Sequence, residues 1–190
     1  MSLKKDIFTQ IGTYLKATLQ NFDPALNLPN LAFFDKQMGQ FTKPATSYAI
    51  PLPCILMELR DFKYESVGKN QQKGNGILRF YIYFENYADA FTGSANQAQA
   101  LRFYDFCQKV NQALQGFDLP YMAPLTRVFE TEDTNEDMII SSTVDYGTII
   151  TDTSTDESAN FTLANPTLSV NKVHSITRPA KNGFVDGYLM

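Results

Sequence analysis

The chain has 190 residues, of which 44% are hydrophobic, with 15 Phe, 10 Tyr and no Trp. This length suits one domain, or one domain with an arm, and the apolar fraction is enough for a sizeable core. The formal net charge of -4 argues against a general nucleic-acid-binding protein, because such a protein needs a basic face to displace the counterions of phosphates. We therefore expect no sequence-specific nucleic-acid partner.

The first predicted element is a helix over residues 3–22. Ile7, Ile11, Leu15 and Leu19 follow one another at four-residue spacing, which places them on one helix face. The proline at position 24 ends the helix, because the residue before a proline avoids the helical region. Residues 23–53 contain several prolines and large apolar side chains. We interpret this segment as an irregular cover that packs on the rest of the domain, with a short strand as the alternative for part of it.

A period of two begins at Cys54 and indicates a long antiparallel hairpin. Residues 54–67 form its first strand, the glycine-rich residues 68–76 its loop, and the second strand begins at residue 77. One face of the second strand is wholly apolar, with Leu78, Phe80, Ile82 and Phe84. The other face carries Arg79, Tyr81 and Tyr83. These three residues predict either a contact surface or a second buried face, and the sequence favours neither.

Helical spacing returns over residues 95–117, with Leu101, Val110 and Leu114 in the apolar stripe that we expect to be buried. Ser94 is the predicted N-cap, and Gly116 lies at the C-terminal end. A second hairpin follows, with an acidic turn between its strands. Local hairpins with helices between them predict an α+β domain, here residues 1–152, in which an antiparallel or mixed sheet packs against two helices. Residues 153–190 are polar, and we expect them to form an extended C-terminal arm.

The residues that could carry chemistry are few. Cys54 and Cys107 both lie in apolar patterns and predict buried free thiols, with a disulfide as the less favoured alternative. His174, the single histidine, lies in the arm and is expected to be solvated. We therefore expect no catalytic residues, no metal site and no cofactor. No apolar window reaches the length of a membrane-spanning helix, so no membrane partner is expected either.

Residues 130–137 form the densest acidic cluster of the chain. It consists of Glu130, Glu132, Asp133, Glu136 and Asp137. The spacing lacks the glycine and the ligand pattern of a helix–loop–helix calcium site. The favoured interpretation is a solvated turn whose charges prevent edge-to-edge association. The alternatives are an acidic surface facing a basic partner and a pore lining that repels DNA phosphates.

The order of these elements resembles that of a known family. An amphipathic helix precedes the proline-led strand PLPCILMEL, the aromatic strand GILRFYIYFENY and a helix, and the chain then continues with a strand carrying Arg127, an acidic turn and the strand VDYGTIITD. This pattern, over roughly residues 5–152, is similar to the tail terminator (tail completion) and head–tail joining proteins of long-tailed phages and prophages. The resemblance lies in the pattern of elements and not in a single motif.

The resemblance implies a structural role and no enzymatic activity. It implies a ring-forming subunit, usually of a hexamer, that caps the tail tube and joins it to the head connector. The implied partners are other copies of the chain, the tail tube protein and connector proteins, and the implied location is the virion tail, with the bacterial host cytoplasm during assembly. Candidate interface residues are Arg79, Tyr81, Tyr83, Arg127, Glu130, Glu132, Asp133, Glu136 and Asp137. The alternative is a non-enzymatic adaptor or small-ligand-binding α+β domain.

Overall fold

The structure is a computed structural model that describes residues 2–20, 28–41, 50–68, 70–85, 90–133 and 139–153. These residues all belong to one compact unit, Met1–Glu157. The elements in chain order are α1 (Leu3–Thr18), β1 (Phe33–Lys36), β2 (Cys54–Gly68), β3 (Gln71–Glu85), α2 (Gln97–Ala100), α3 (Arg102–Leu114), β4 (Thr126–Asp133) and β5 (Ile139–Asp152).

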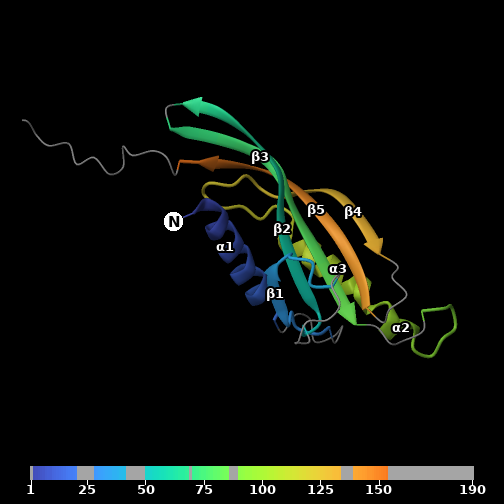
Figure 1. Cartoon of the computed structure of the whole chain (residues 1–190). Coiled ribbons are helices and arrows are strands. Elements are labelled where there is room, and N and C mark those ends of the chain that lie inside the picture. The colour runs from blue at the N-terminus through green and yellow to red at the C-terminus, as the bar shows by residue number, and fades with distance from the viewer. Residues whose placement is uncertain are drawn as a thin grey trace, which may run out of the picture. The chain divides into compact units, whose positions relative to one another are not determined.

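The strands form a single mixed sheet in the order β1-β2-β3-β5-β4 (Figure 1). β1 pairs with β2 in parallel, and the other neighbours are antiparallel. The α+β class with a mixed sheet is thereby confirmed. β5 lies between β3 and β4, so the two hairpins are joined side by side through the β3–β5 pairing.

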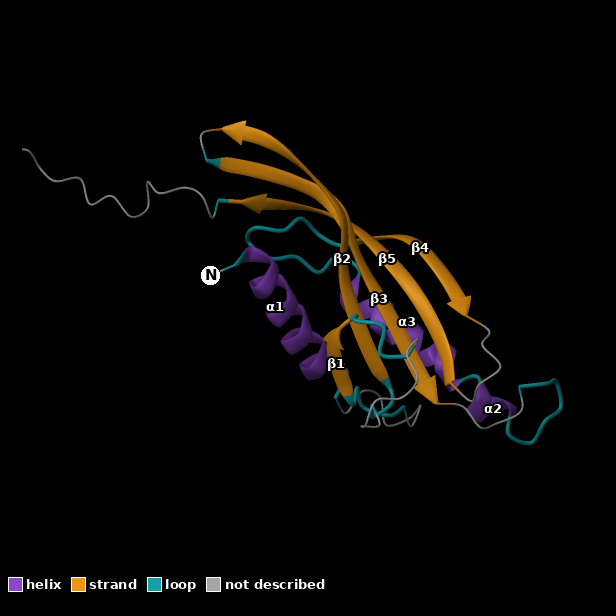
Figure 2. Cartoon of the chain, viewed as in Figure 1, coloured by secondary structure: helices purple, strands orange, loops and turns teal. Residues whose placement is uncertain are grey.

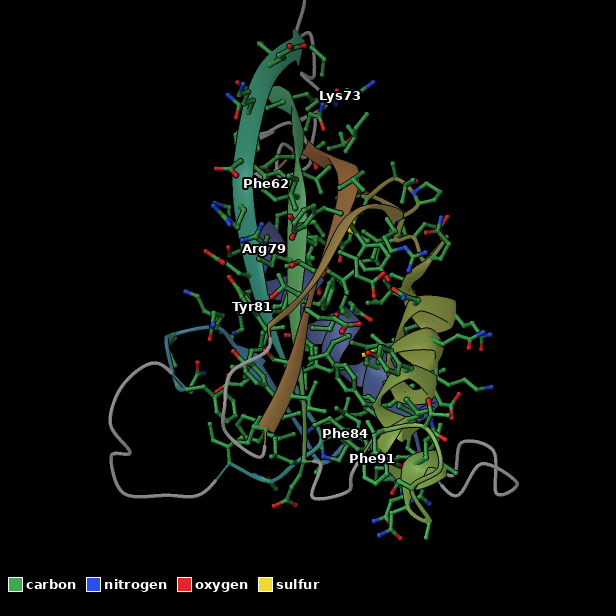
Figure 3. The ribbon with its side chains drawn as sticks, turned by 90° about the vertical axis from the view of Figure 1, so that its right-hand side faces the viewer. Phe62, Lys73, Arg79, Tyr81, Phe84 and Phe91 are labelled. Carbon is green, nitrogen blue, oxygen red and sulfur yellow. The ribbon has the colours of Figure 1, made fainter. Side chains whose placement is uncertain are left out.

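Both long helices pack on the same face of the sheet (Figure 2). α1 contributes the predicted stripe of Ile7, Ile11 and Leu15, and α3 contributes Val110 and Leu114. The predicted apolar face of β3 lies beneath them, with Leu78, Phe80 and Ile82 fully buried and Phe84 nearly so. Figure 3 shows Phe84 on the helix side of the sheet and Arg79 and Tyr81 on the opposite side. The strand phase predicted from the sequence is thus confirmed.

The predicted second helix is interrupted. It divides at Leu101 into α2 and α3, and Leu101, expected in the buried stripe, is instead 40% exposed. The N-cap of α2 is Asn96 and not Ser94. Gly116 follows the end of α3 with φ at 81°, as expected for a glycine beyond a helix C-terminus.

The predicted loop at residues 68–76 is wrong, because β3 begins at Gln71 and includes both Gly74 and Gly76. These glycines make room for aromatic rings of β2. A Cβ built on Gly76 would lie 2.4 Å from Cγ of Phe62, and one on Gly74 would lie 2.7 Å from Cε1 of Tyr64. A glycine within a strand often marks such a close approach.

The segment predicted as an irregular cover contains a strand, which was the alternative for part of it. β1 extends the sheet beside the first residues of β2, with Phe33 opposite Cys54. Phe34 of β1 packs where α1 crosses it, since a Cβ on Gly12 would lie 2.7 Å from its ring. The first helix ends at Thr18, four residues earlier than the predicted residue 22. Residues 21–27 and 42–49 lie outside the described residues.

Candidate functional site

A polar network crosses three strands on the face of the sheet opposite the helices. Arg79 of β3 lies opposite Asp145 of β5 and donates two hydrogen bonds to it, from Nε to Oδ1 at 2.6 Å and from Nη2 to Oδ2 at 2.7 Å. The hydroxyl of Tyr81 donates to Oε2 of Glu58 on β2 at 3.0 Å. Asp145 is only 4% exposed, and its two-point contact with Arg79 is the strongest type of arginine–carboxylate pair. Arg79 and Tyr81 are therefore already bonded within the sheet.

These contacts fix the charge states of the network. The hydrogen bond to Asp145 is the main cause that raises the pKa of Arg79 above its ordinary value. Burial is the main cause that raises the pKa of Tyr81. At neutral pH the network therefore contains a charged guanidinium and a neutral phenol, and neither side chain is poised to transfer a proton.

Tyr83 belongs to a more closely packed part of the same face. Its ring stacks on that of Phe41, with centroids 4.0 Å apart and an interplanar angle of 25°. Cys54, opposite Tyr83, and Leu56, opposite Tyr81, are fully buried. Arg79, Tyr81 and Tyr83 are all half-buried, so this strand face is neither fully buried nor fully exposed.

Next to the network lies an exposed cluster, the outer apolar patch, formed by Val128, Phe129 and Ile149. Val128, Phe129 and Ile149 are 58%, 50% and 46% exposed. A register shift in β4 brings Val128 over Gly147, where an added Cβ would meet Val128 at 3.3 Å. Neighbouring exposed apolar side chains on a sheet face are typical of a protein contact surface.

A groove of about 620 Å³ lies between α3 and β4, and we call it the α3–β4 groove. Its lining consists of Tyr104, Cys107, Gln108, Asn111, Gln112, Gln115, Arg127 and Glu130. Hydrogen bonds join its two walls at both ends. Tyr104 of α3 donates to Oε2 of Glu132 at 3.2 Å, and the backbone N–H of Arg127 donates to Oε1 of Gln115 at 3.1 Å. On the β4 wall, Nη1 of Arg127 lies 2.8 Å from Oε2 of Glu130.

The β4 wall of the groove is electronegative. The charge of Glu132 is the main cause that raises the pKa of Tyr104. Burial is the main cause that raises the pKa of Cys107 to about 12, and the charges of Glu130 and Glu132 add to it. Since Arg127 is paired with Glu130, the second carboxylate, that of Glu132, leaves this wall with net negative charge.

The candidate interface residues fall into two groups on opposite faces of the sheet. Arg79, Tyr81 and Tyr83 lie on the outer face, whereas Arg127, Glu130 and Glu132 line or flank the groove. The side chain of Asp133, and Glu136 and Asp137 altogether, lie outside the described residues.

The sequence reasoning missed two parts of these surfaces. One is Asp145, an acid in the middle of β5, far from the terminal Asp152, and an acid at such a position is a signal for a buried partner. The other is the polar face of α3, where Gln108 and Gln112 recur at four-residue spacing.

Other sequence expectations concern thiols, metals and membranes. Cys54 and Cys107 are free and buried, as predicted. Among the described residues, no group of three or more His, Cys, Asp or Glu is placed to hold a metal ion. In the same part of the chain, no helix is long and apolar enough to cross a membrane. His174 lies outside the described residues.

No family model matches the chain, and no curated protein matches it. Among solved structures, the chain is similar to a chain of the structure titled "Virion of native gene transfer agent (GTA) particle". The TM-score is 0.40 and the identity 13%, over 75% of this chain and 98% of that chain. At this TM-score and identity the likeness carries no inference about what the chain does.

Proposed function

We propose that this chain is a structural, non-enzymatic subunit of a phage or phage-like tail, a ring-forming tail terminator that caps the tail tube and joins it to the head connector. The order α1, β2, β3, α3, β4, β5 supports the proposal, because it is the order of elements on which the resemblance to that family rests. The proposed location follows from the role: the virion tail, reached by assembly in the host cytoplasm.

The observation that carries the proposal is the edge at β4. β4 is the last strand of the sheet, so among the described residues no strand pairs with its outer side. The exposed Val128 and Phe129 lie on this strand beside that edge. An edge that contacts a different surface of the next copy makes a head-to-tail interface, and such interfaces close into a ring when the rotation between copies allows.

The acidic residues of β4 support a role of the proposed ring as a channel through which DNA passes. Glu130 and Glu132 lie on β4 and belong to the acidic cluster of residues 130–137. In a ring whose lumen carries DNA, carboxylates along the lumen repel the phosphates and leave the duplex free to pass. This arrangement requires no nucleic-acid-binding face, in agreement with the net charge of -4.

Native mass spectrometry and electron microscopy of the purified chain, with and without tail tube protein, test the proposal. We expect a ring, or a ring that forms on a tube end, with a contact of more than ~1,000 Å² between neighbours. Phe129→Glu should weaken this association. Phe91→Glu is the matched control, because Phe91 is also exposed but lies before α2 and not on β4. A chain that stays monomeric under all these conditions, with no affinity for tube or connector, would exclude the tail terminator role.

The α3–β4 groove favours a second candidate function, a non-enzymatic adaptor or ligand-binding domain. Its volume of about 620 Å³ is in the range of small-molecule and peptide sites, and its lining is rich in amide and hydroxyl groups. A monomeric chain whose Gln112→Ala variant loses a bound ligand would support this alternative.

A further inference from the structure

The α3–β4 groove and the open edge of β4 together have the features of a site for an extended peptide. In recognition by strand addition, a peptide pairs with an exposed edge strand, and its alternate side chains enter an adjoining groove. β4 supplies the edge beyond Arg127, whose N–H already donates to Gln115, and α3 supplies the far wall of the groove. The groove offers hydrogen-bonding side chains such as Gln108 and Gln112, and the β4 wall is negative because the carboxylate of Glu132 adds to the Arg127–Glu130 ion pair. The best-matched peptide is therefore extended and basic.

The sequence of the chain contains such a segment. Residues 158–185 include Lys172, Arg178 and Lys181 and no Asp or Glu. Within them, residues 167–178 (TLSVNKVHSITR) contain no proline and are bracketed by Pro166 and Pro179. This run is rich in β-branched residues, which favour strands, and is longer than the eight residues of β4.

The run alternates cleanly with a period of two. Its even positions are Leu168, Val170, Lys172, His174, Ile176 and Arg178, and its odd positions are mostly small and polar. A strand of this sequence therefore carries both of its permanent cations on one face. Residues 154–166, which connect it to the described part of the chain, span about 40 Å when extended, at ~3.3 Å per residue. That length is enough to reach an adjacent molecule.

We propose that residues 167–178 of a neighbouring copy add as a strand to the edge of β4, with the even-numbered side chains in the α3–β4 groove and their cations toward Glu130 and Glu132. This pairing rests on the self-association proposed above and identifies the surface that receives the arm. It gives the edge of β4 a partner, and it joins successive copies through backbone hydrogen bonds as well as charge.

A charge-reversal cycle tests the electrostatic part of the proposal. The probe is a fluorescent synthetic peptide of residues 165–180, titrated with the full chain and followed by anisotropy. We expect Glu132→Lys in the chain, or Lys172→Glu in the peptide, to weaken binding by ~10-fold, and the two together to restore much of it. Glu65→Lys, at an exposed position near the end of β2, is the matched control and should leave binding unchanged. Equal affinity of the Glu132→Lys and Glu65→Lys chains would overturn the inference.

The backbone part of the proposal is tested with proline in the peptide. Proline removes an N–H, and in a strand the N–H groups of consecutive residues point to opposite sides. One of Val173→Pro and His174→Pro must therefore remove a donor that the pairing needs, and that peptide should bind at least ~10-fold more weakly. Unchanged affinity of both peptides would exclude strand addition.

These experiments distinguish a failure of the proposed ring from a failure of the proposed strand addition at the α3–β4 groove. Rings that persist unchanged in all three full-chain variants, Glu132→Lys, Val173→Pro and His174→Pro, would overturn this inference and leave the proposed function standing. A chain that stays monomeric, yet binds the peptide with the charge dependence above, would overturn the ring and leave the pairing of segment and groove in place.

Discussion

Phe80 occupies the centre of the core, fully buried between the sheet and the helices. Its ring meets that of Tyr146 edge-on, with centroids 5.7 Å apart and an interplanar angle of 84°. Phe80→Ala should lower the free energy of unfolding by ~3–5 kcal/mol, because it removes buried apolar surface and leaves a cavity. Urea denaturation measures the change. Phe129→Ala, which shortens a half-exposed ring, should cost far less, and similar losses from the two variants would contradict the assignment of faces.

The two buried thiols predict a dependence of stability on alkaline pH. Burial raises the folded-state pKa of both Cys54 and Cys107 from 9.0 to about 12. The unfolded chain therefore releases these protons at lower pH than the folded protein does. The stabilisation is complete below pH 9 and is lost as the pH rises toward about 12.

The test compares the wild-type chain with a Cys54→Ala/Cys107→Ala double variant in urea denaturation at increasing pH. Above pH 9, the free energy of unfolding should fall more steeply in the wild type. Tyrosines with raised pKa are present in both proteins and cancel in the comparison. Parallel curves would show that the thiols titrate normally in the folded state.

The β2–β3 hairpin depends on two glycines that look like loop residues in the sequence. Gly76→Ala should destabilise the protein by ~1–3 kcal/mol, because the new Cβ overlaps the ring of Phe62. Phe62→Ala in the same chain should remove part of that cost, so the two changes should not be additive in denaturation experiments. Gly68→Ala is the control, since its Cβ meets nothing within 4 Å. An equal cost at Gly68 and Gly76 would contradict the packing.

The same glycines show where sequence reasoning succeeds and fails for the elements. Alternation of large apolar residues was enough to predict the phase of β3, because a shift by one residue would expose all of Leu78, Phe80 and Ile82. The start of β3 was missed because Gly74 and Gly76 have loop-like composition, and only the rings across the strand pair explain them. The break at Leu101 was likewise hidden within continuous helical spacing.

The sequence was enough to select individual candidate residues, but not to show how they are distributed over the two faces of the sheet. Arg79 and Tyr81 stood out as polar groups in an aromatic strand, and Arg127 and Glu130 as charges beside the acidic turn. Their separation onto opposite faces follows from the β3–β5 register and from the register shift in β4. Both depend on pairing between distant parts of the chain. The bond between Arg79 and Asp145 depends on the same pairing.

The whole domain should fold without the segment that follows β5. Among the described residues, the buried core cluster runs from Ile7 to Ile150, and truncation after Asp152 keeps all of these residues. We expect the truncated chain to keep the cooperative unfolding transition of the full chain in urea, followed by circular dichroism. Its self-association, measured by sedimentation, should weaken. Loss of the transition itself would place residues 153–190 in the core and contradict the predicted division into domain and arm.

The position of β5 between β3 and β4 has a consequence for the kinetics of folding. Each hairpin is a local structure and can form in ~1–10 μs, whereas the seam between β3 and β5 joins Gln72 to Asp152, with α3 and β4 in the intervening chain. The chain between β3 and β5 must lose conformational entropy on closing this loop before most of the apolar surface of the seam is buried. We therefore expect docking of the two preformed hairpins to limit the folding rate. Substitutions in the seam should then slow folding, while those near the hairpin turns should mainly speed unfolding.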